Sequence, residues 1–294
     1  MIRVTLALGL RSTAQSLGVI GRDLGVFAAH GVDLAIIREE TAGPEGLRGL
    51  IDGDYEFAEF GAVPIVQGAF EGKDPLILMA AEPVSALYIL GRTGVSAPSN
   101  VTCVGVLSAA GQTGFSARKM LERWGRGDAA QLVPLGTYPK IYRALAAGEI
   151  DAGVLTADYR LAGELAHGFH ALVDLGAEFR FQGPVVATTR RLRDRDPERV
   201  RAVVAAYVDA IARFKSSPAE VVPILKRHLG FVDDAQAEAI QRFYAARFQA
   251  RPLASVEGVA RVIATMAGDY PGVTLRAEDL CDASFVQSAT AGVH

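Results

Sequence analysis

The stretch "RGLIDGDYEFAEFG", residues 48–61, decides the fold because the chain contains almost the same pattern twice. The second copy, "RALAAGEIDAGVLT", spans residues 143–156, an offset of 95 (143 − 48). Each copy has a basic residue, a leucine, a glycine at its sixth position, an acidic residue and a short apolar run. The glycine is typical of a helix end, and the apolar run of a strand. Two similar α/β lobes explain the repetition more simply than one large sheet, and chance similarity between strand–helix units is the alternative.

The composition weighs against several classes of partner. The 294 residues are 50% hydrophobic, which is enough for two domains. A charged fraction of 21% and a net charge of −3 do not suggest nucleic acid or an anionic membrane as a partner. Apolar runs end well short of the ~20 residues of a membrane span, so no transmembrane segment is expected. Cys103 and Cys281 form no Cys-x-x-Cys motif, and neither a disulfide, a metal site nor a cofactor is expected.

Strand-like and helix-like segments alternate along the chain, which is typical of parallel sheets covered by helices on both faces. One helix is expected between a cap at Ser12 or Thr13 and a stop at Gly31. A shift in composition over residues 85–101 suggests a boundary. The C-terminal tail, from residue 197 onward, is expected to be nearly all helix. The expected strands are residues 2–9, 32–39, 55–61, 75–81, 101–108, 130–136, 150–156 and 169–176, and the expected tail helices are residues 197–214, 218–229, 234–248 and 256–267.

Ligands of such sheets bind beyond the carboxyl ends of the strands, where helices begin. The loops in those places give the candidate ligand-binding residues. In the first lobe they are Gly9, Arg11, Ser12, Thr41, Gly61, Ala62 and Glu82; in the second they are Ser108, Gln112, Thr113, Gly114, Tyr138, Thr156 and Asp158.

Two of these places carry specific chemistry. Arg11 offers a bidentate contact for a carboxylate or sulfonate, with a solvated loop charge as the alternative. The loop "SAAGQTGFSARK", residues 108–119, brings small residues to a helix start, which favours an anion. It lacks the P-loop spacing, and an ordinary turn capped by Thr113 is the alternative. No catalytic residues are assigned, and a Gly-x-Ser-x-Gly elbow is absent.

Two longer segments carry a family resemblance. "GLRGLIDGDYEFAEFGAVPIVQGAFEGKDPLILMA", residues 46–80, and "GTYPKIYRALAAGEIDAGVLTADYRLAGELAHGF", residues 136–169, resemble the corresponding lobes of type II periplasmic binding proteins. The subgroup that they resemble serves nitrate, sulfonate, taurine and thiamine-precursor ABC transporters. The resemblance covers roughly residues 1–215. Glu59 departs from it, because a smaller residue is common at that position.

The resemblance implies a two-lobed α/β clamp with a helical C-terminal tail: residues 1–91 form the first lobe, residues 92–183 the second, and residues 184–294 return to the first. It implies contacts from Arg11 and Ser12, Gly61 and Ala62, Thr113 and Gly114, and Thr156 and Asp158.

The expected function is binding of a small anionic or heterocyclic organic ligand for an ABC importer, with the permease as partner. The alternatives are a cytosolic enzyme on the same fold, such as a decarboxylase or another lyase or hydrolase, and, less favoured, a cytosolic ligand sensor. The first residues do not resemble an export signal. A periplasmic location is expected if such a signal has been removed, and a cytoplasmic one otherwise.

Overall fold

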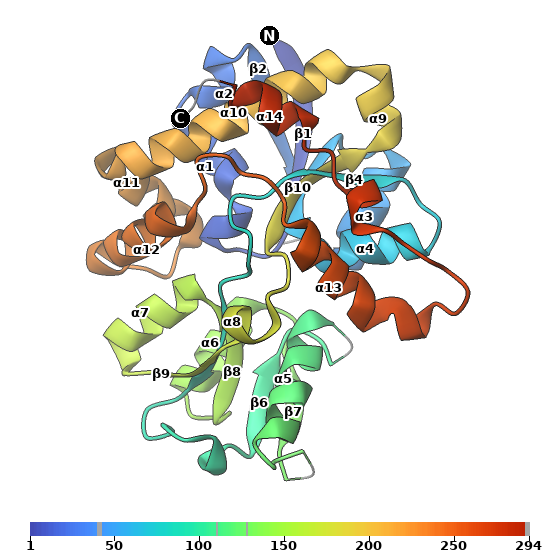
Figure 1. The fold of residues 1–294 in the computed structure, drawn as a ribbon. Helices are drawn as coiled ribbons and strands as arrows, with labels where there is room; N and C mark the ends of the chain where they lie inside the picture. The colour runs from blue at the N-terminus through green and yellow to red at the C-terminus, as the bar shows by residue number, and fades with distance from the viewer. Residues whose placement is uncertain (40–42, 110, 128, 292–294) are drawn as a thin grey trace. The chain divides into compact units, whose positions relative to one another are not determined.

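The computed structural model describes residues 1–39, 43–109, 111–127 and 129–291. The chain divides into two compact units. The first comprises Met1–Val84 and Phe181–His294, and the second is the continuous insertion Ser85–Arg180 (Figure 1). Residues 85–91 were expected in the first lobe and residues 181–183 in the second; the crossings lie a few residues earlier.

The first unit has a five-stranded sheet in the order β2-β1-β3-β10-β4. β1 pairs in parallel with both β2 and β3, whereas β10 is antiparallel to β3 and β4. The strands span Ile2–Leu8 (β1), Val32–Arg38 (β2), Phe57–Gly61 (β3), Pro75–Met79 (β4) and Pro184–Thr189 (β10). Every residue of β4 is buried, as a continuous apolar run in a covered sheet requires.

The second unit has a sheet of the same design, in the order β7-β6-β8-β5-β9. β6 pairs in parallel with β7 and β8, and β5 is antiparallel to β8 and β9. The strands span Leu87–Gly91 (β5), Cys103–Val106 (β6), Gln131–Pro134 (β7), Ala152–Thr156 (β8) and His170–Asp174 (β9). The strand at the fourth place in each of these orders is β10 in the first sheet and β5 in the second. Each is the first strand that the chain forms after it crosses from the other unit.

The repeated sequence pattern is a repeated structure. Helices α3 (Gly43–Asp52) and α6 (Tyr138–Ala146) end before Gly53 (φ 87°) and Gly148 (φ 73°), both left-handed. In each copy the next amide, Asp54 or Glu149, bonds the carbonyl five residues back at 2.9 Å. The turn after α3 leads to β3, and the turn after α6 leads to β8; these strands hold the same place in their two sheets. α4 (Ala62–Phe70) follows β3 directly, and α7 (Ala157–His167) follows β8 directly. The expected pair of similar α/β lobes is confirmed.

Helices cover both faces of the first sheet. Adjacent strand residues point to opposite faces. Glu59 therefore meets α1 (Leu17–Asp23) and Tyr207 of α10 (Pro197–Ser216), whereas the ring of Phe60 lies against Gly46 of α3. In the second unit a Cβ on Gly153 would lie 2.6 Å from Ile141 of α6, so that helix packs closely on its sheet.

The first helical segment differs from the expectation of one helix ending at Gly31. It is broken into a short 3-10 turn, η1 (Thr13–Gln15), then α1 and α2 (Val26–Ala29). Gly25 has a left-handed φ of 74°, which a continuous helix cannot contain. Ser16, not Ser12 or Thr13, occupies the position before α1. Helical spacing of apolar residues continues across such a break, so the sequence pattern did not reveal it.

The tail helices form as predicted: α10 (Pro197–Ser216), α11 (Pro218–Leu229), α12 (Asp234–Arg247) and α13 (Val256–Met266). α10 packs on α1 and α2 and buries Tyr207 and Phe214 completely. The other elements are α5 (Gln112–Arg123), α8 (Leu175–Phe179), α9 (Arg190–Arg195), α14 (Ser284–Ala289), η2 (Pro98–Asn100), η3 (Ala267–Asp269) and η4 (Ala277–Leu280).

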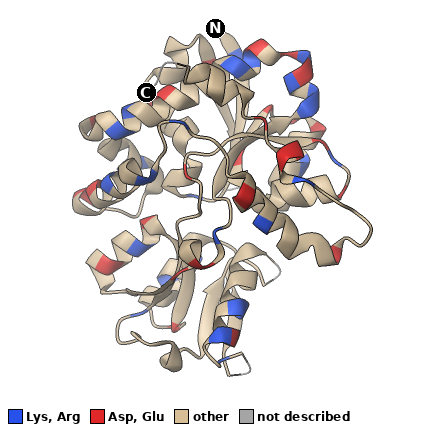
Figure 2. Cartoon of the chain, in the orientation of Figure 1, with Lys and Arg blue, Asp and Glu red and all other residues tan. Residues whose placement is uncertain are grey.

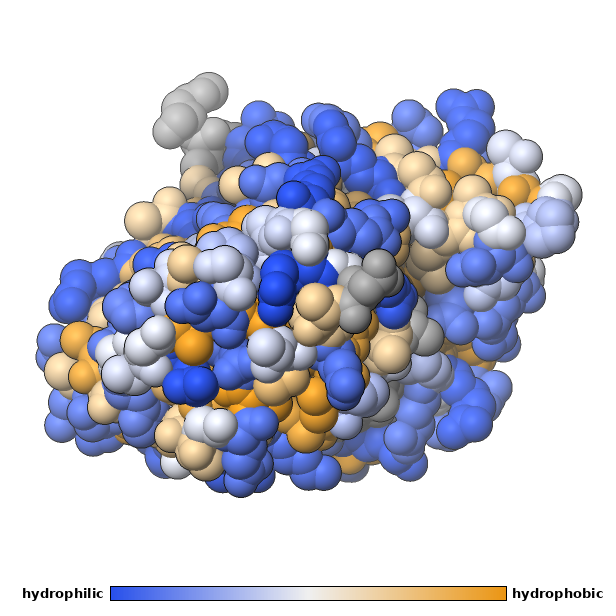
Figure 3. Space-filling view, turned by 90° about the horizontal axis from the view of Figure 1, so that it is seen from below, coloured by the Kyte–Doolittle hydropathy of each residue, from blue (hydrophilic) through white to orange (hydrophobic). Residues whose placement is uncertain are grey.

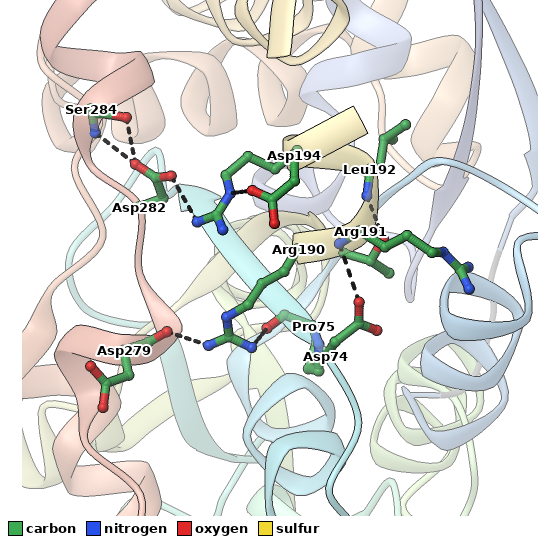
Figure 4. Close-up of polar contacts among 11 residues, drawn as sticks. Asp74, Pro75, Arg190, Arg191, Leu192, Asp194, Asp279, Asp282 and Ser284 are labelled. Carbon is green, nitrogen blue, oxygen red and sulfur yellow. Dashed lines mark hydrogen bonds and ion pairs between the residues drawn. The ribbon is translucent and has the colours of Figure 1, made fainter. Parts of the chain in front are cut away.

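The C-terminal segment is tied to the edge of the first sheet (Figure 4). Cys281 forms a β-bridge with Ile77 of β4, and the Asp282 amide donates to the Ile77 carbonyl at 2.9 Å. The Arg190 guanidinium donates to the carbonyls of Pro75, at 3.3 Å, and Asp279. One arginine therefore joins β4 to the segment that covers it.

Replacing Arg190 by alanine is expected to lower the free energy of unfolding by about 1 kcal/mol, because two carbonyls lose a charged donor. Urea unfolding measures this, with Arg195→Ala as the control. Arg195 is an exposed residue of the same helix. Equal losses in both variants would show that the Arg190 bridge contributes nothing specific.

The surfaces carry both signs of charge. Figure 2 shows Lys and Arg interspersed with Asp and Glu over the helices of each unit. Hydrophilic residues cover most of the face in Figure 3, where hydrophobic residues appear between them. Among the described residues, no helix combines the length and the hydrophobicity needed to cross a membrane.

Candidate functional site

The first candidate region is the segment that follows β1. The Gly9 amide donates to the Glu59 carbonyl at 2.9 Å, so the chain leaves the sheet beside β3. Ser12 is 1% exposed and Arg11 is half-buried. The segment then turns through η1 into α1, and it carries three of the predicted residues, Gly9, Arg11 and Ser12.

This segment forms one wall of a recess within the first unit. Its empty volume of about 170 Å³ includes open solvent, and no part of it, as the described residues line it, is wide enough to admit a water molecule, so a ligand reaches Arg11 here only when the lining side chains move. Its lining combines cationic, hydroxyl and amide side chains with one carboxylate. The lining residues are Leu8, Gly9, Arg11, Gln15, Ser16, Glu39 and His228.

Of the lining residues, the sequence identified Gly9 and Arg11 but not Leu8, Gln15, Ser16, Glu39 or His228. His228 is the most distant of these along the chain. It comes from the last turn of α11, 212 residues after Ser16. Its Nε2 lies 2.7 Å from Ser16 Oγ. The Ser16 hydroxyl donates its single proton to the Ser12 carbonyl at 2.6 Å. With that proton placed on Ser12, His228 Nε2 is the donor to Ser16, so both protons of this pair are used within the protein and Ser16 is not an activated nucleophile.

The end of α11 favours the positive charge of Arg11. A Cβ on Gly230, the residue after that helix, would lie 3.6 Å from Arg11 Nη1. The last carbonyls of a helix carry partial negative charge, so a guanidinium beside them is stabilised. Arg11 is thus held at the recess by the protein itself.

Glu59 lies beneath this segment and is 1% exposed. Its carboxylate accepts bonds from the amides of Leu17 at 2.7 Å and Gly18 at 3.0 Å, at the start of α1. The Tyr207 hydroxyl donates to it at 3.2 Å. Burial raises the pKa of the Glu59 carboxyl to about 7, against the lowering effect of these three bonds.

The other predicted residues of the first unit are placed differently. Gly61 and Ala62 join β3 directly to α4, and a Cβ on Gly61 would meet open space. Glu82 is 1% exposed and is paired with Arg247 Nε at 3.0 Å. Its carboxylate is therefore engaged in an internal ion pair. Thr41 lies outside the described residues.

In the second unit, one predicted group lies at the start of α5. The Thr113 hydroxyl accepts a bond from the Leu107 amide at 3.1 Å. Gly111 is the residue before the helix, so in the alternative of a turn capped by Thr113, the capped amide is that of Leu107 and not one of the helix. A Cβ on Gly114 would lie 2.4 Å from the Ser108 carbonyl oxygen. Gln112 opens the helix. The loop packs tightly on the first turn of α5.

A second group gathers where β8 meets α7. Asp158 is fully buried in the first turn of α7, and the Thr156 hydroxyl donates to its carboxylate at 3.0 Å. Burial, and secondarily the charge of Asp158, raise the pKa of Tyr138. The rings of Tyr138 and Tyr159 are 5.7 Å apart. Tyr138, Thr156 and Asp158 therefore form one buried polar cluster.

The structure thus brings the predicted residues together in three groups. Gly9 and Arg11 meet at the recess, with Ser12 alongside. The α5 loop holds Ser108, Gln112, Thr113 and Gly114, and the α7 start holds Tyr138, Thr156 and Asp158. Within the described parts of the chain, no group of three or more His, Cys, Asp or Glu side chains has the arrangement of a metal site.

Comparison with known proteins gives structural matches only. Neither models of protein families nor curated proteins match this sequence. A protein from Bordetella bronchiseptica RB50 matches with a TM-score of 0.82 and 16% identity, over 99% of this chain and 98% of that one. The alkanesulfonate-binding protein SsuA from Xanthomonas axonopodis pv. citri, bound to MOPS, gives 0.71 and 17%, over 98% and 96% of the two chains.

An enzyme shares the fold as well. A mutant of DSZB in complex with biphenyl-2-sulfinic acid matches with a TM-score of 0.73 and 17% identity, over 98% of this chain and 99% of that one. DSZB is a desulfurization enzyme. Likeness at such low identity shows the fold and not the function. The fold is that of the type II periplasmic binding proteins, as the sequence predicted.

Proposed function

We propose that this chain, which has the periplasmic-binding-protein fold, binds a small organic anion and delivers it to the permease of an ABC importer. The observation that carries the proposal is the half-buried Arg11 guanidinium, which lines the recess beside the end of α11. A periplasmic location is part of the proposal, because delivery to a permease takes place outside the cytoplasm.

The chemistry of the recess favours a carboxylate or a sulfonate. A guanidinium binds two oxygens of such a group at once. SsuA, one of the proteins with this fold, binds alkanesulfonates. Glu39 also lines the recess, and its charge disfavours ligands with a second anionic group nearby. We therefore infer a monoanion.

The α5 loop is proposed as the ligand contact of the second unit, because it offers amides at the start of a twelve-residue helix. The Thr156 hydroxyl at the start of α7 already donates to the buried Asp158 carboxylate, so its proton is used within that unit.

Arg11→Ala is expected to weaken binding of a small anion at least tenfold, about 1.4 kcal/mol, because a charge-assisted bond is lost. Titration calorimetry with methanesulfonate, butanesulfonate, butanoate and MOPS measures this. The control is Arg3→Ala, which removes an exposed charge near the other end of β1. Unchanged affinity in the Arg11 variant would remove Arg11 from the site, and no binding of any probe by the unaltered protein would contradict the ligand class.

An enzyme is the second candidate, and the likeness to DSZB is the observation that favours it. Incubation with biphenyl-2-sulfinic acid, followed by chromatography, separates the two. Conversion of the compound would favour an enzyme. Binding with full recovery of the unchanged compound would favour solute capture. The Ser16 proton, already donated to the Ser12 carbonyl, gives no support to serine chemistry.

A further inference from the structure

Glu59 holds both ends of the segment that carries the recess residues. Its backbone carbonyl accepts the Gly9 amide at 2.9 Å. Its carboxylate accepts the amides of Leu17 at 2.7 Å and Gly18 at 3.0 Å. Residues 10–16 lie between these contacts. One residue in the middle strand of the sheet therefore fixes where this segment leaves the sheet and where α1 begins.

The fit at both contacts is close. A Cβ on Gly18 would lie 2.4 Å from Leu6 Cδ2 and 2.8 Å from the Tyr207 hydroxyl. A Cβ on Gly9 would lie 2.1 Å from Gln15 Oε1. Any larger residue at either position would force these atoms apart. Glycine at positions 9 and 18 therefore lets the Gly9 and Gly18 amides come close enough to bond with Glu59.

The segment between the contacts has no strand partner of its own. Its backbone bonds are local: Gln15 N to the Ser12 carbonyl at 3.0 Å, and Ser16 N to the Thr13 carbonyl at 3.2 Å. These bonds shape η1, which also packs against β3, β10 and α12. At each end of the segment, a backbone amide donates to Glu59.

We propose that Glu59 is a positioning residue: its carboxylate sets the placement of residues 9–18 and, through them, the direction in which Arg11 enters the recess. The inference rests on the proposed function. A carboxylate is suited to the task because it offers two acceptor oxygens to two consecutive amides. Glutamine keeps one of those acceptors. Aspartate keeps both, and the charge, but is shorter by one methylene.

The groups that face Glu59 are few. Tyr207 of α10 contacts the carboxylate, β1 contributes Leu6, and α1 contributes the Leu17 and Gly18 amides. The charged groups at the neighbouring recess are Arg11, Glu39 and His228. Because the pKa of Glu59 is raised to about 7, its titration falls in an accessible range and is reported by the amides that it binds.

The test compares the unaltered protein with Glu59→Asp and Glu59→Gln, and with Glu56→Gln as the matched control. Glu56 lies next to β3 and pairs with Arg199, away from residues 9–18. The first readout is the pH profile of the Leu17 and Gly18 amide chemical shifts in NMR spectra. Both amides are expected to titrate together in the unaltered protein and in Glu56→Gln, and to show no such step in Glu59→Gln.

The second readout is affinity for butanesulfonate, measured at a temperature where each variant is folded. Glu59→Asp is expected to weaken binding roughly tenfold, as for a lost charge-assisted bond, with a smaller loss in Glu59→Gln. Unchanged affinity in both variants would overturn the inference, and so would amides of Leu17 and Gly18 that do not respond to Glu59.

The two proposals fail differently. If the unaltered protein binds no butanesulfonate, the ligand class is wrong, and the amide profiles alone decide whether Glu59 places the segment. If it binds butanesulfonate but the Glu59 variants bind equally well, the proposed function stands and the positioning role fails.

Discussion

Glu59→Gln is expected to remove a contribution of about 3 kcal/mol to the pH dependence of the free energy of unfolding. Burial raises the pKa of this carboxyl to about 7 in the folded protein, from an ordinary value of 4.5. Each unit of difference corresponds to about 1.4 kcal/mol. The native state therefore holds a proton that the unfolded chain has already released.

The sign follows from the raised pKa. The stabilising contribution of Glu59 is fully present below its unfolded pKa of about 4.3, and it is lost as the pH rises through about 7. Urea unfolding of the unaltered protein and of Glu59→Gln between pH 4 and pH 8 measures this contribution. The difference between their free energies of unfolding is expected to change by about 3 kcal/mol across this range.

Glu45→Gln is the control, because Glu45 is half-exposed and pairs with Arg38 at the surface. Its profile is expected to run parallel to that of the unaltered protein. A parallel profile for Glu59→Gln as well would show that the buried carboxyl has an ordinary pKa, because its three hydrogen bonds offset the effect of burial.

Gly114→Ala is expected to destabilise the second unit by about 3 kcal/mol, in the upper part of the range for overpacking. The new Cβ would lie 2.3 Å from the Ala109 carbonyl oxygen and 2.4 Å from that of Ser108. Both contacts are with backbone, which cannot rotate away as a side chain does. The α5 loop must move, and binding of the anionic probes is expected to weaken with it.

Gly127→Ala is the matched control in the same unit, because its Cβ would meet Glu122 Cγ at an ordinary 3.8 Å. Urea unfolding and calorimetry are measured on both variants. A Gly114 variant as stable as the control would mean that the loop has room to move. A destabilised variant with unchanged affinity for the probes would remove the α5 loop from the proposed ligand site.

Much of the fold could be predicted because its signals are local. The left-handed turns at Gly53 and Gly148 follow from glycine at a helix end, and the buried strands follow from short apolar runs. The same local signals placed the tail helices within a few residues of their bounds. They also indicated the loops beyond the strands, which is why the sequence points to Gly9 and Arg11, two residues that line the recess.

The rest depends on contacts between distant parts of the chain. His228 reaches Ser16 across 212 residues, and no spacing in the sequence connects them. The sequence marks Glu59 as a departure from a resemblance, but a lone acid within a strand does not reveal which amides it will meet. Thr113 has the residue type of a helix cap, but the Leu107 amide uses its hydroxyl instead.

The shared design of the two sheets has a consequence for synthesis on the ribosome. The strand between β3 and β4 is β10, at residues 184–189, so these two strands have no hydrogen-bonded neighbour in common until that part of the chain has emerged. The second unit, Ser85–Arg180, has all of its own strands by then. The inserted unit is therefore complete first, and the unit that begins the polypeptide must wait for it.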